Sequence, residues 1–92
     1  MANRRVHVWI SGKVQGVFFR ASVHSEATRR GLAGWVKNLP DGRVEAAFEG
    51  DFKQVETMLD WCQSGNHLSR VDHVETREET LKRESQEFEI RY

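Results

Sequence analysis

The stretch "VHVWISGKVQGVFFRASVHSEA", from Val6 to Ala27, joins two different periodicities through a glycine loop. Apolar and polar residues alternate from Val6 to Ile10, which predicts a strand with one buried face. From Phe19 the apolar spacing changes to i, i+4 and i+8 through Val23 and Ala27, which is typical of one stripe of a helix. A strand that feeds a helix through a loop of this kind is the first unit of an α+β fold.

The rest of the chain repeats this organisation. "LPDGR" predicts a hairpin turn between two strands, and Asp51 is placed to cap a second helix that ends near Gly65, with Gln54 in capping-box position. The apolar face of this helix is expected to hold Phe52, Val55, Leu59 and Cys62, with Met58 beside it. We expect strands at 33–39, 43–49, 70–76 and 88–92, a helix at 19–30 and a solvated loop at 77–85. This order predicts a single domain over residues 1–92, a ferredoxin-like βαββαβ sandwich with an antiparallel sheet and two helices packed on one face.

The composition of the chain limits the functions that it can have. Charged residues make up 30% of the chain and the formal net charge is zero, although residues 1–46 carry +5 and residues 47–92 carry −5. That asymmetry favours a small anion site, since a nucleic-acid binder would be more basic overall. The single cysteine, Cys62, excludes an intrachain disulfide and is expected to be buried. No apolar run has the length of a membrane span and no signal peptide is visible, so we expect a cytoplasmic monomer without a membrane contact.

The glycine loop "GKVQGVFFR", from Gly12 to Arg20, supports two interpretations. In the first, Gly12 and Gly16 relieve strain in a tight turn and Arg20 is a solvated helix residue. In the second, unpaired backbone amides and the helix N-terminus hold an anion, and the guanidinium of Arg20 adds a rigid fork of donors. A cation in the first turn opposes the helix dipole, and a bound anion would explain its presence.

The second candidate position is Asn38 in "GWVKN", at the end of a strand and before the turn. Asparagine commonly initiates turns, which is the simpler interpretation. The alternative is a neutral amide that donates to one oxygen and accepts from a water molecule. The sequence leaves open whether Asn38 and the glycine loop meet.

Other motifs are weaker. His7, His24, His67 and His73 show no metal-binding spacing, and His24 is read as an exposed helix residue in preference to a general base. The tryptophans Trp9, Trp35 and Trp61 would suit base stacking, because RNA-recognition domains share this topology. The neutral net charge and the lack of an RNP-like run argue against nucleic acid.

Together, the two motifs resemble those of the acylphosphatase family. One family signature is matched by Ile10–Arg20, and the other by Gly34–Asn38 followed by Gly42, Val44 and Gly50 at the family's spacings. The ending "FEIRY" also resembles the family's last strand. The segment 65–74 departs from the family's proline-containing pattern, so the resemblance does not predict its shape.

The resemblance implies an enzyme that hydrolyses the carboxyl–phosphate bond of small acyl phosphates without a cofactor, a metal or a phosphoenzyme. Carried over to this chain, it gives Arg20 the role of binding phosphate and Asn38 that of positioning the attacking water. It gives the rest of the phosphate contact to the loop amides of Lys13, Val14, Gln15, Gly16, Val17, Phe18 and Phe19. The rival expectation is a catalytically silent anion-binding module of the same fold.

Overall fold

The computed structural model describes residues 2–92, and Met1 lies outside the described part. Within this part the elements follow the predicted β-α-β-β-α-β order, with one short strand after them. They are β1 (Asn3–Lys13), α1 (Phe19–Arg29), β2 (Ala33–Asn38), β3 (Val44–Asp51), α2 (Phe52–Ser64), β4 (Arg70–Glu79) and β5 (Phe88–Ile90).

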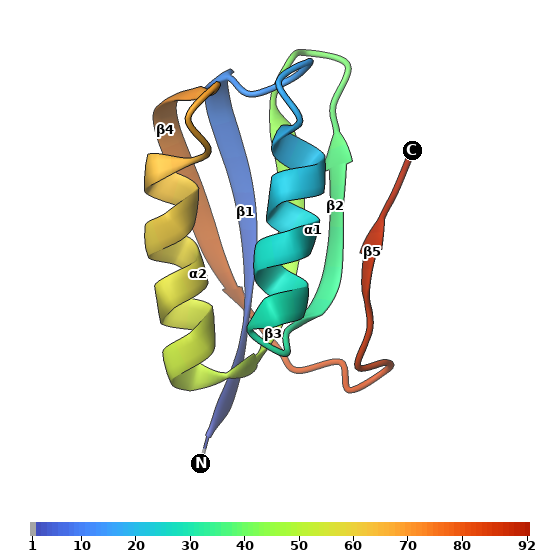
Figure 1. Cartoon of the computed structure of the whole chain (residues 1–92). Coiled ribbons are helices and arrows are strands. Elements are labelled where there is room, and N and C mark those ends of the chain that lie inside the picture. The colour runs from blue at the N-terminus through green and yellow to red at the C-terminus, as the bar shows by residue number, and fades with distance from the viewer. Residues whose placement is uncertain (1) are drawn as a thin grey trace.

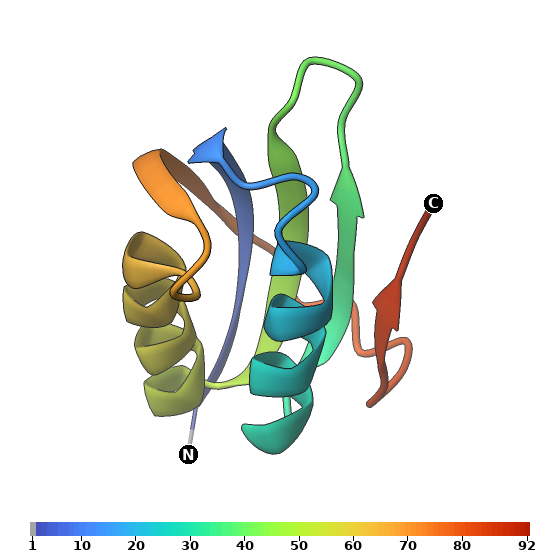
Figure 2. The same cartoon turned by 45° about the horizontal axis from the view of Figure 1, so that its top comes forward.

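The strands form one sheet in the order β4-β1-β3-β2-β5, and both helices cover the same face of it (Figures 1 and 2). β3 lies between β1 and β2 and pairs antiparallel with each, and β4 pairs antiparallel with β1. The predicted ferredoxin-like sandwich is therefore confirmed. β5 runs parallel to β2, so the complete sheet is mixed and only its first four strands are antiparallel.

The core follows the two predicted periodicities. Val6, Val8 and Ile10 of β1 are buried, and they face the layer of helices. Phe19, Val23 and Ala27 are the buried residues of α1. Cys62 of α2 is also buried, as expected, and burial raises the pKa of its thiol to about 12. No helix within residues 2–92 is long and apolar enough to cross a bilayer.

α2 begins where expected but buries a different set of side chains. The carboxylate of Asp51 accepts hydrogen bonds from the amides of Lys53 and Gln54, which satisfies two orphan donors of the helix. The placement of Phe52 on the buried face was wrong, because the residue is 46% exposed and its ring lies under the guanidinium of Arg4. As the first helical residue, it lies at the end of the helix, outside the stripe that faces the sheet.

The segment Arg77–Ser85, expected to be a solvated loop, is more ordered than that. β4 extends through Glu79, and the backbone amides of Lys82 and Arg83 each donate to the carboxylate of Glu49, at 3.0 Å. Mixed charge is a poor guide here, because two carboxylates of this segment, those of Glu78 and Glu79, have partners on the neighbouring strand β1.

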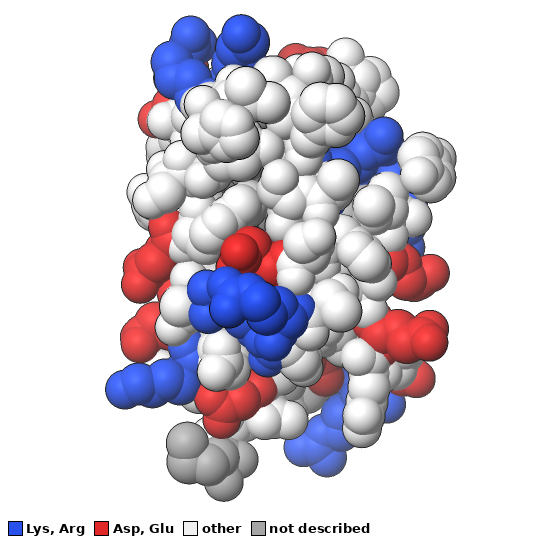
Figure 3. Space-filling view, in the orientation of Figure 1, with Lys and Arg blue, Asp and Glu red and all other residues white. Residues whose placement is uncertain are grey.

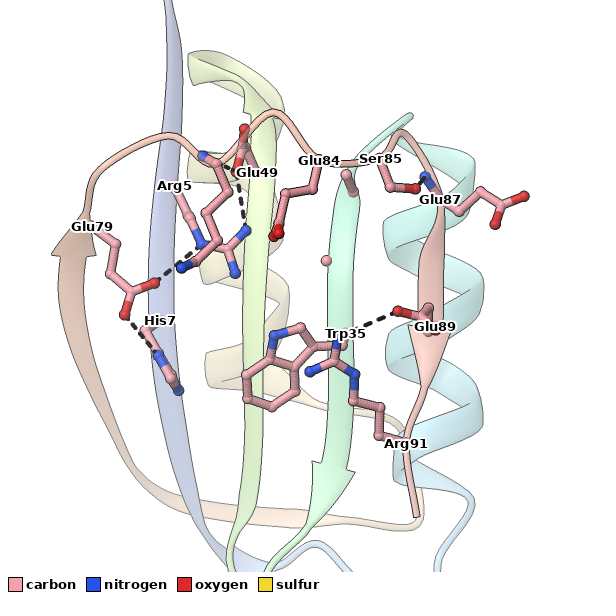
Figure 4. Close-up of a pocket in the computed structure, with 13 residues that line it drawn as sticks. Arg5, His7, Trp35, Glu49, Glu79, Glu84, Ser85, Glu87, Glu89 and Arg91 are labelled. Atoms are coloured by element: carbon pink, nitrogen blue, oxygen red, sulfur yellow. Dashed lines mark hydrogen bonds and ion pairs between the residues drawn. The ribbon is translucent and has the colours of Figure 1, made fainter.

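The sheet face that the helices leave uncovered carries a cluster of paired charges (Figure 4). The Arg5 guanidinium lies 3.0 Å from Glu49 Oε1 through Nη1 and 3.1 Å from Glu79 Oε1 through Nε. The ring nitrogens of His7 lie 2.6 Å from Glu45 Oε2 and 2.9 Å from Glu79 Oε2. Since these side chains are largely buried, each charge depends on its partner, and the pairs tie β1 to β3 and β4.

Charge is therefore balanced in space although it is unbalanced along the sequence. Arg4 and Arg5 belong to the basic half of the chain, yet they pair with Glu78, Glu49 and Glu79 of the acidic half. On the helical face, basic and acidic side chains lie interspersed (Figure 3). The asymmetry between the two halves thus reflects pairing across the sheet.

These pairs predict a dependence of stability on pH. Hydrogen bonding to His7 lowers the pKa of Glu79, against the effect of its burial and with help from Arg5. Burial raises the pKa of Glu49, but bonds from the amides of Lys82 and Arg83 and from Arg5 outweigh it and leave that pKa lowered. Both carboxyls are more acidic folded than unfolded, so their contribution to stability is complete above the unfolded pKa of glutamate and is lost as the pH falls through the lowered folded pKa.

We therefore expect the free energy of unfolding, measured in urea, to fall as the pH is lowered from neutral through the unfolded pKa of glutamate and below it. Glu49→Gln should be less stable at pH 7 by about 1–3 kcal/mol and should depend on pH less steeply than the parent. Parallel pH profiles for the two proteins would contradict the assignment of Glu49.

Candidate functional site

The loop between β1 and α1 is apolar because its side chains anchor it to the core. Val14 and Phe19 are 1% exposed and Val17 is 9% exposed, whereas Phe18 is 75% exposed. The side chains that point inward hold the loop in place, so its backbone is left at the surface. The hydrophobic character of this stretch thus fixes its position and leaves the main chain available for binding.

The backbone amides of this loop are free to bind a ligand. Among residues 2–92, no backbone carbonyl accepts from the amides of Gln15, Gly16, Val17 or Phe18. The first turn of α1 has neither a side-chain cap nor an acidic residue, and its first bonded amide is that of Ser22. Unpaired amides at the positive end of a helix dipole are an anion-binding arrangement.

Arg20 is the second residue of α1 and adds a cation to this helix end. Its Nη1 donates one long hydrogen bond, 3.4 Å, to the carbonyl of Arg91, and its guanidinium lies 4.7 Å from the ring centroid of Tyr92. Among the ion pairs of residues 2–92, none involves Arg20. Its charge is therefore held in place without being neutralised.

Asn38 closes β2 and contributes a buried polar atom. Its Oδ1 is buried, and no group within the described residues donates a hydrogen bond to it. An unsatisfied buried acceptor is costly and calls for a donor such as a water molecule. This is the feature that the functional interpretation of Asn38 requires.

Arg20 and Asn38 line one cavity of about 320 Å³, which answers the question that the sequence left open. Of the other expected loop residues, the same cavity is lined by Val14, Gly16, Phe18 and Phe19. The rest of its lining is Ala21, Ile90 and Tyr92. Lys13, Gln15 and Val17 do not line it.

Gln15 instead fixes the loop to the neighbouring turn. Its Nε2 donates to the carbonyls of Leu39 and Arg43, at 2.8 and 2.9 Å. Those residues belong to the β2–β3 turn that follows Asn38, which lies beside the β1–α1 loop in Figure 1. The side chain of Gln15 therefore sets the loop relative to Asn38 across the end of β3.

Sequence reasoning missed two neighbours of this site. Tyr92, expected at the end of the last strand, lies beyond β5 with its ring against Arg20. Asn66 lies between α2 and β4, and its side chain bonds to the loop. The sequence feature that could have drawn attention to Asn66 was that its segment, 65–74, departs from the family's pattern.

The remaining candidates lie elsewhere. His24 is half-buried and packs against Phe88, with ring centroids 6.1 Å apart. Trp9 stacks on His7 on the uncovered sheet face, at 4.2 Å, and Trp61 packs against Phe19. The cavity on the uncovered face, of about 540 Å³, is lined largely by charged residues, among which Arg5 pairs with Glu49 and Glu79 and Arg91 pairs with Glu89 (Figure 4).

Comparison with known proteins agrees with this geometry. The sequence model of the acylphosphatase family matches residues 6–90. This chain belongs to the acylphosphatase family. It is 54% identical over 92 residues to an acylphosphatase of Syntrophobacter fumaroxidans, covering all of this chain and 95% of that relative. The family resemblance inferred from the two motifs is thereby confirmed.

Solved acylphosphatase structures share the fold. One from Coxiella burnetii superposes with a TM-score of 0.92 at 37% identity, covering 97% of this chain and 93% of that one. One from Bacillus subtilis gives the same TM-score at 36% identity, covering 97% and 99%.

The two glycines of the stretch Gly12–Arg20 have different surroundings, although both have positive φ, since Gly12 belongs to β1 and Gly16 to the loop. Gly12, at φ 131°, lies where the register of β1 against β4 shifts, and a Cβ there would be 2.1 Å from the carbonyl oxygen of Arg70. Gly16, at φ 73°, has open space around the corresponding position. Gly12 thus permits close packing of two strands, whereas Gly16 leaves room beside the loop.

Alanine at the two positions should therefore have unequal effects. We expect Gly12→Ala to lower the free energy of unfolding by about 3 kcal/mol or more, since the backbone at Arg70 would have to move to make room for the Cβ. Gly16→Ala should lower the free energy of unfolding by only about 1–2 kcal/mol, which is the cost of placing alanine in the left-handed conformation. Urea unfolding at pH 7 measures both, and equal losses would contradict these separate roles.

Proposed function

We propose that this acylphosphatase hydrolyses small acyl phosphates with Arg20 and the loop amides holding the phosphoryl group and Asn38 orienting the water. The observation that carries the proposal is the shared cavity. It is lined by Arg20, whose guanidinium has no carboxylate partner, by Gly16 and Phe18, whose amides have no backbone acceptor, and by Asn38, whose buried Oδ1 has no donor within the described residues. The first two groups suit an anion, and the third suits the hydrogen of a neutral nucleophile.

The reaction needs little covalent help from the protein. A water oxygen attacks phosphorus, the bond from phosphorus to the acyl oxygen breaks, and a carboxylate and dihydrogen phosphate result. Because a carboxylate is a good leaving group, no general acid is required. Phosphoryl transfer of this kind depends on holding the equatorial oxygens and on placing the nucleophile in line.

Charge stabilisation supplies the larger part of the effect. The loop amides and Arg20 are preorganised donors, and each strong donor of this kind contributes roughly 3–4 kcal/mol in the transition state. Asn38 Oδ1 would accept from the attacking water and orient its lone pair toward phosphorus. The loop therefore binds, and a residue of another strand handles the nucleophile.

The wider setting belongs to the same proposal. We propose that residues 1–92 act as one domain and as a monomer in the cytoplasm. The pairing of the charges on the uncovered sheet face supports the monomer, because these groups need no partner from a second chain.

The division of labour can be measured with two variants and acetyl phosphate as substrate. Arg20→Gln should raise KM, and the inhibition constant of inorganic phosphate, by about 100-fold or more, because it removes a charged donor. Asn38→Ala should lower kcat by about 100- to 1,000-fold and leave the inhibition constant of phosphate within about threefold of the parent.

Turnover by the wild-type protein should persist in EDTA, because the proposed mechanism uses no metal.

Two matched controls accompany these variants. Arg29→Gln repeats the arginine-to-glutamine change in the last turn of α1, where the arginine pairs with Glu26. Asn3→Ala repeats the asparagine-to-alanine change at the far end of β1. Both should have parental kinetics. An inactive wild-type protein would favour the silent anion-binding module, and near-normal kcat in Asn38→Ala would remove its assigned role.

A further inference from the structure

The exposed residue Phe18 has a backbone conformation that needs support. Its φ is 59° and its ψ is 24°, in the left-handed region that non-glycine residues rarely adopt. Strained residues of this kind persist only where the surrounding structure determines them, and they gather at binding and catalytic sites. Phe18 immediately precedes α1 and lines the cavity that holds Arg20 and Asn38.

Both peptide groups that flank Phe18 are held by hydrogen bonds. The carbonyl of Phe18 accepts from the amide of Ser22 at 2.9 Å. The carbonyl of Val17, on the other side, accepts from Nδ2 of Asn66 at 2.9 Å. The first bond belongs to the start of the helix, but the second comes from the segment between α2 and β4. That segment lies at the same end of the molecule as the loop (Figures 1 and 2).

Asn66 is itself firmly placed. Its Nδ2 also donates to Ser22 Oγ at 3.0 Å, and its Oδ1 accepts from the amide of Leu68 at 3.0 Å. Its own carbonyl accepts from Ser69 Oγ at 2.9 Å. Three polar atoms of one residue are therefore used, and the amide group cannot turn without losing several bonds together.

The bond to Val17 has a directional consequence. A trans peptide is planar, so its C=O and N–H point in opposite directions, and no cis peptide occurs within residues 2–92. Fixing the Val17 carbonyl toward Asn66 therefore aims the Phe18 N–H away from Asn66. Asn66 lines a separate cavity with Ser22 and Trp61, whereas Phe18 lines the cavity of Arg20.

We propose that Asn66 is a positioning residue that holds Phe18 left-handed and aims the loop amides at the phosphoryl group. This inference rests on the proposed function, since it requires phosphate in the β1–α1 loop. It adds a residue outside both sequence motifs, in the segment where this chain departs from the family's pattern.

The test uses inorganic phosphate as the probe, by competitive inhibition of acetyl phosphate hydrolysis and by the ¹⁵N–¹H shift of the Phe18 amide. Asn66→Ala should raise KM and the inhibition constant by about tenfold, keep kcat within about threefold, and reduce the phosphate-induced shift of that amide. A role confined to stability would lower the unfolding midpoint and the active fraction but would leave KM and the inhibition constant unchanged, which would overturn the proposal.

Four further proteins sharpen the test. Asn66→Asp keeps an acceptor for the Leu68 amide but removes the two donated bonds. It should therefore weaken phosphate binding at least as much as Asn66→Ala does. If Asn66→Asp weakens phosphate binding and Asn66→Ala does not, the loss is caused by the added negative charge and the proposal fails. Gln63→Glu makes the same amide-to-carboxylate change at an exposed position of α2 and should have parental kinetics. In a Phe18→Gly background, where left-handed backbone is free of strain, Asn66→Ala should have less than a threefold effect.

The outcomes also separate this inference from the proposed function. If phosphate shifts the Phe18 amide of the wild-type protein and Asn66→Ala binds it equally well, only the role of Asn66 fails. If phosphate leaves the ¹⁵N–¹H shifts of the loop amides of the wild-type protein unchanged, both the proposed phosphate site and the role of Asn66 fail.

Discussion

Burial of three side chains, two in the β1–α1 loop and one in the first residue of α1, is the constraint on which the site depends. Val14, Val17 and Phe19 are packed into the core, and this fixes a loop that has no regular structure of its own. With its side chains used inward, the loop presents its main chain outward, and within residues 2–92 no backbone carbonyl accepts from the amides of residues 15–18. A more polar loop would solvate itself and would lose this preorganisation, because each amide would have to exchange a local partner for the ligand.

Electrostatics follows the same logic. Across the sheet, charged side chains pair with one another, and Arg5 is held between Glu49 and Glu79. Arg20 is placed by contacts that leave its charge intact, a carbonyl and an aromatic ring. A carboxylate beside Arg20 would compete with an anionic substrate. The uncovered face thus stabilises the sheet, and the end of the sandwich keeps a free cation for binding.

Much of this could be predicted from the sequence. Period-two and period-four spacings placed β1 and α1, and two motifs located Arg20 and Asn38, since local patterns encode local structure. Their meeting in one cavity depends on β3 lying between β1 and β2, which the order of elements implies but the spacing of residues does not. Phe52, the ordered part of 77–85 and the parallel pairing of β5 were not foreseen, because each depends on a contact between distant segments. Asn66 was missed for the same reason, since a lone asparagine in a turn reads as turn chemistry.

The most direct test of the account is a crystal structure of the chain soaked in inorganic phosphate. The account predicts an ion in the β1–α1 loop, with its oxygens within about 2.7–3.2 Å of the loop amides and of the Arg20 guanidinium. An ion bound elsewhere, for example among the paired charges of the uncovered sheet face, with the loop empty, would contradict it.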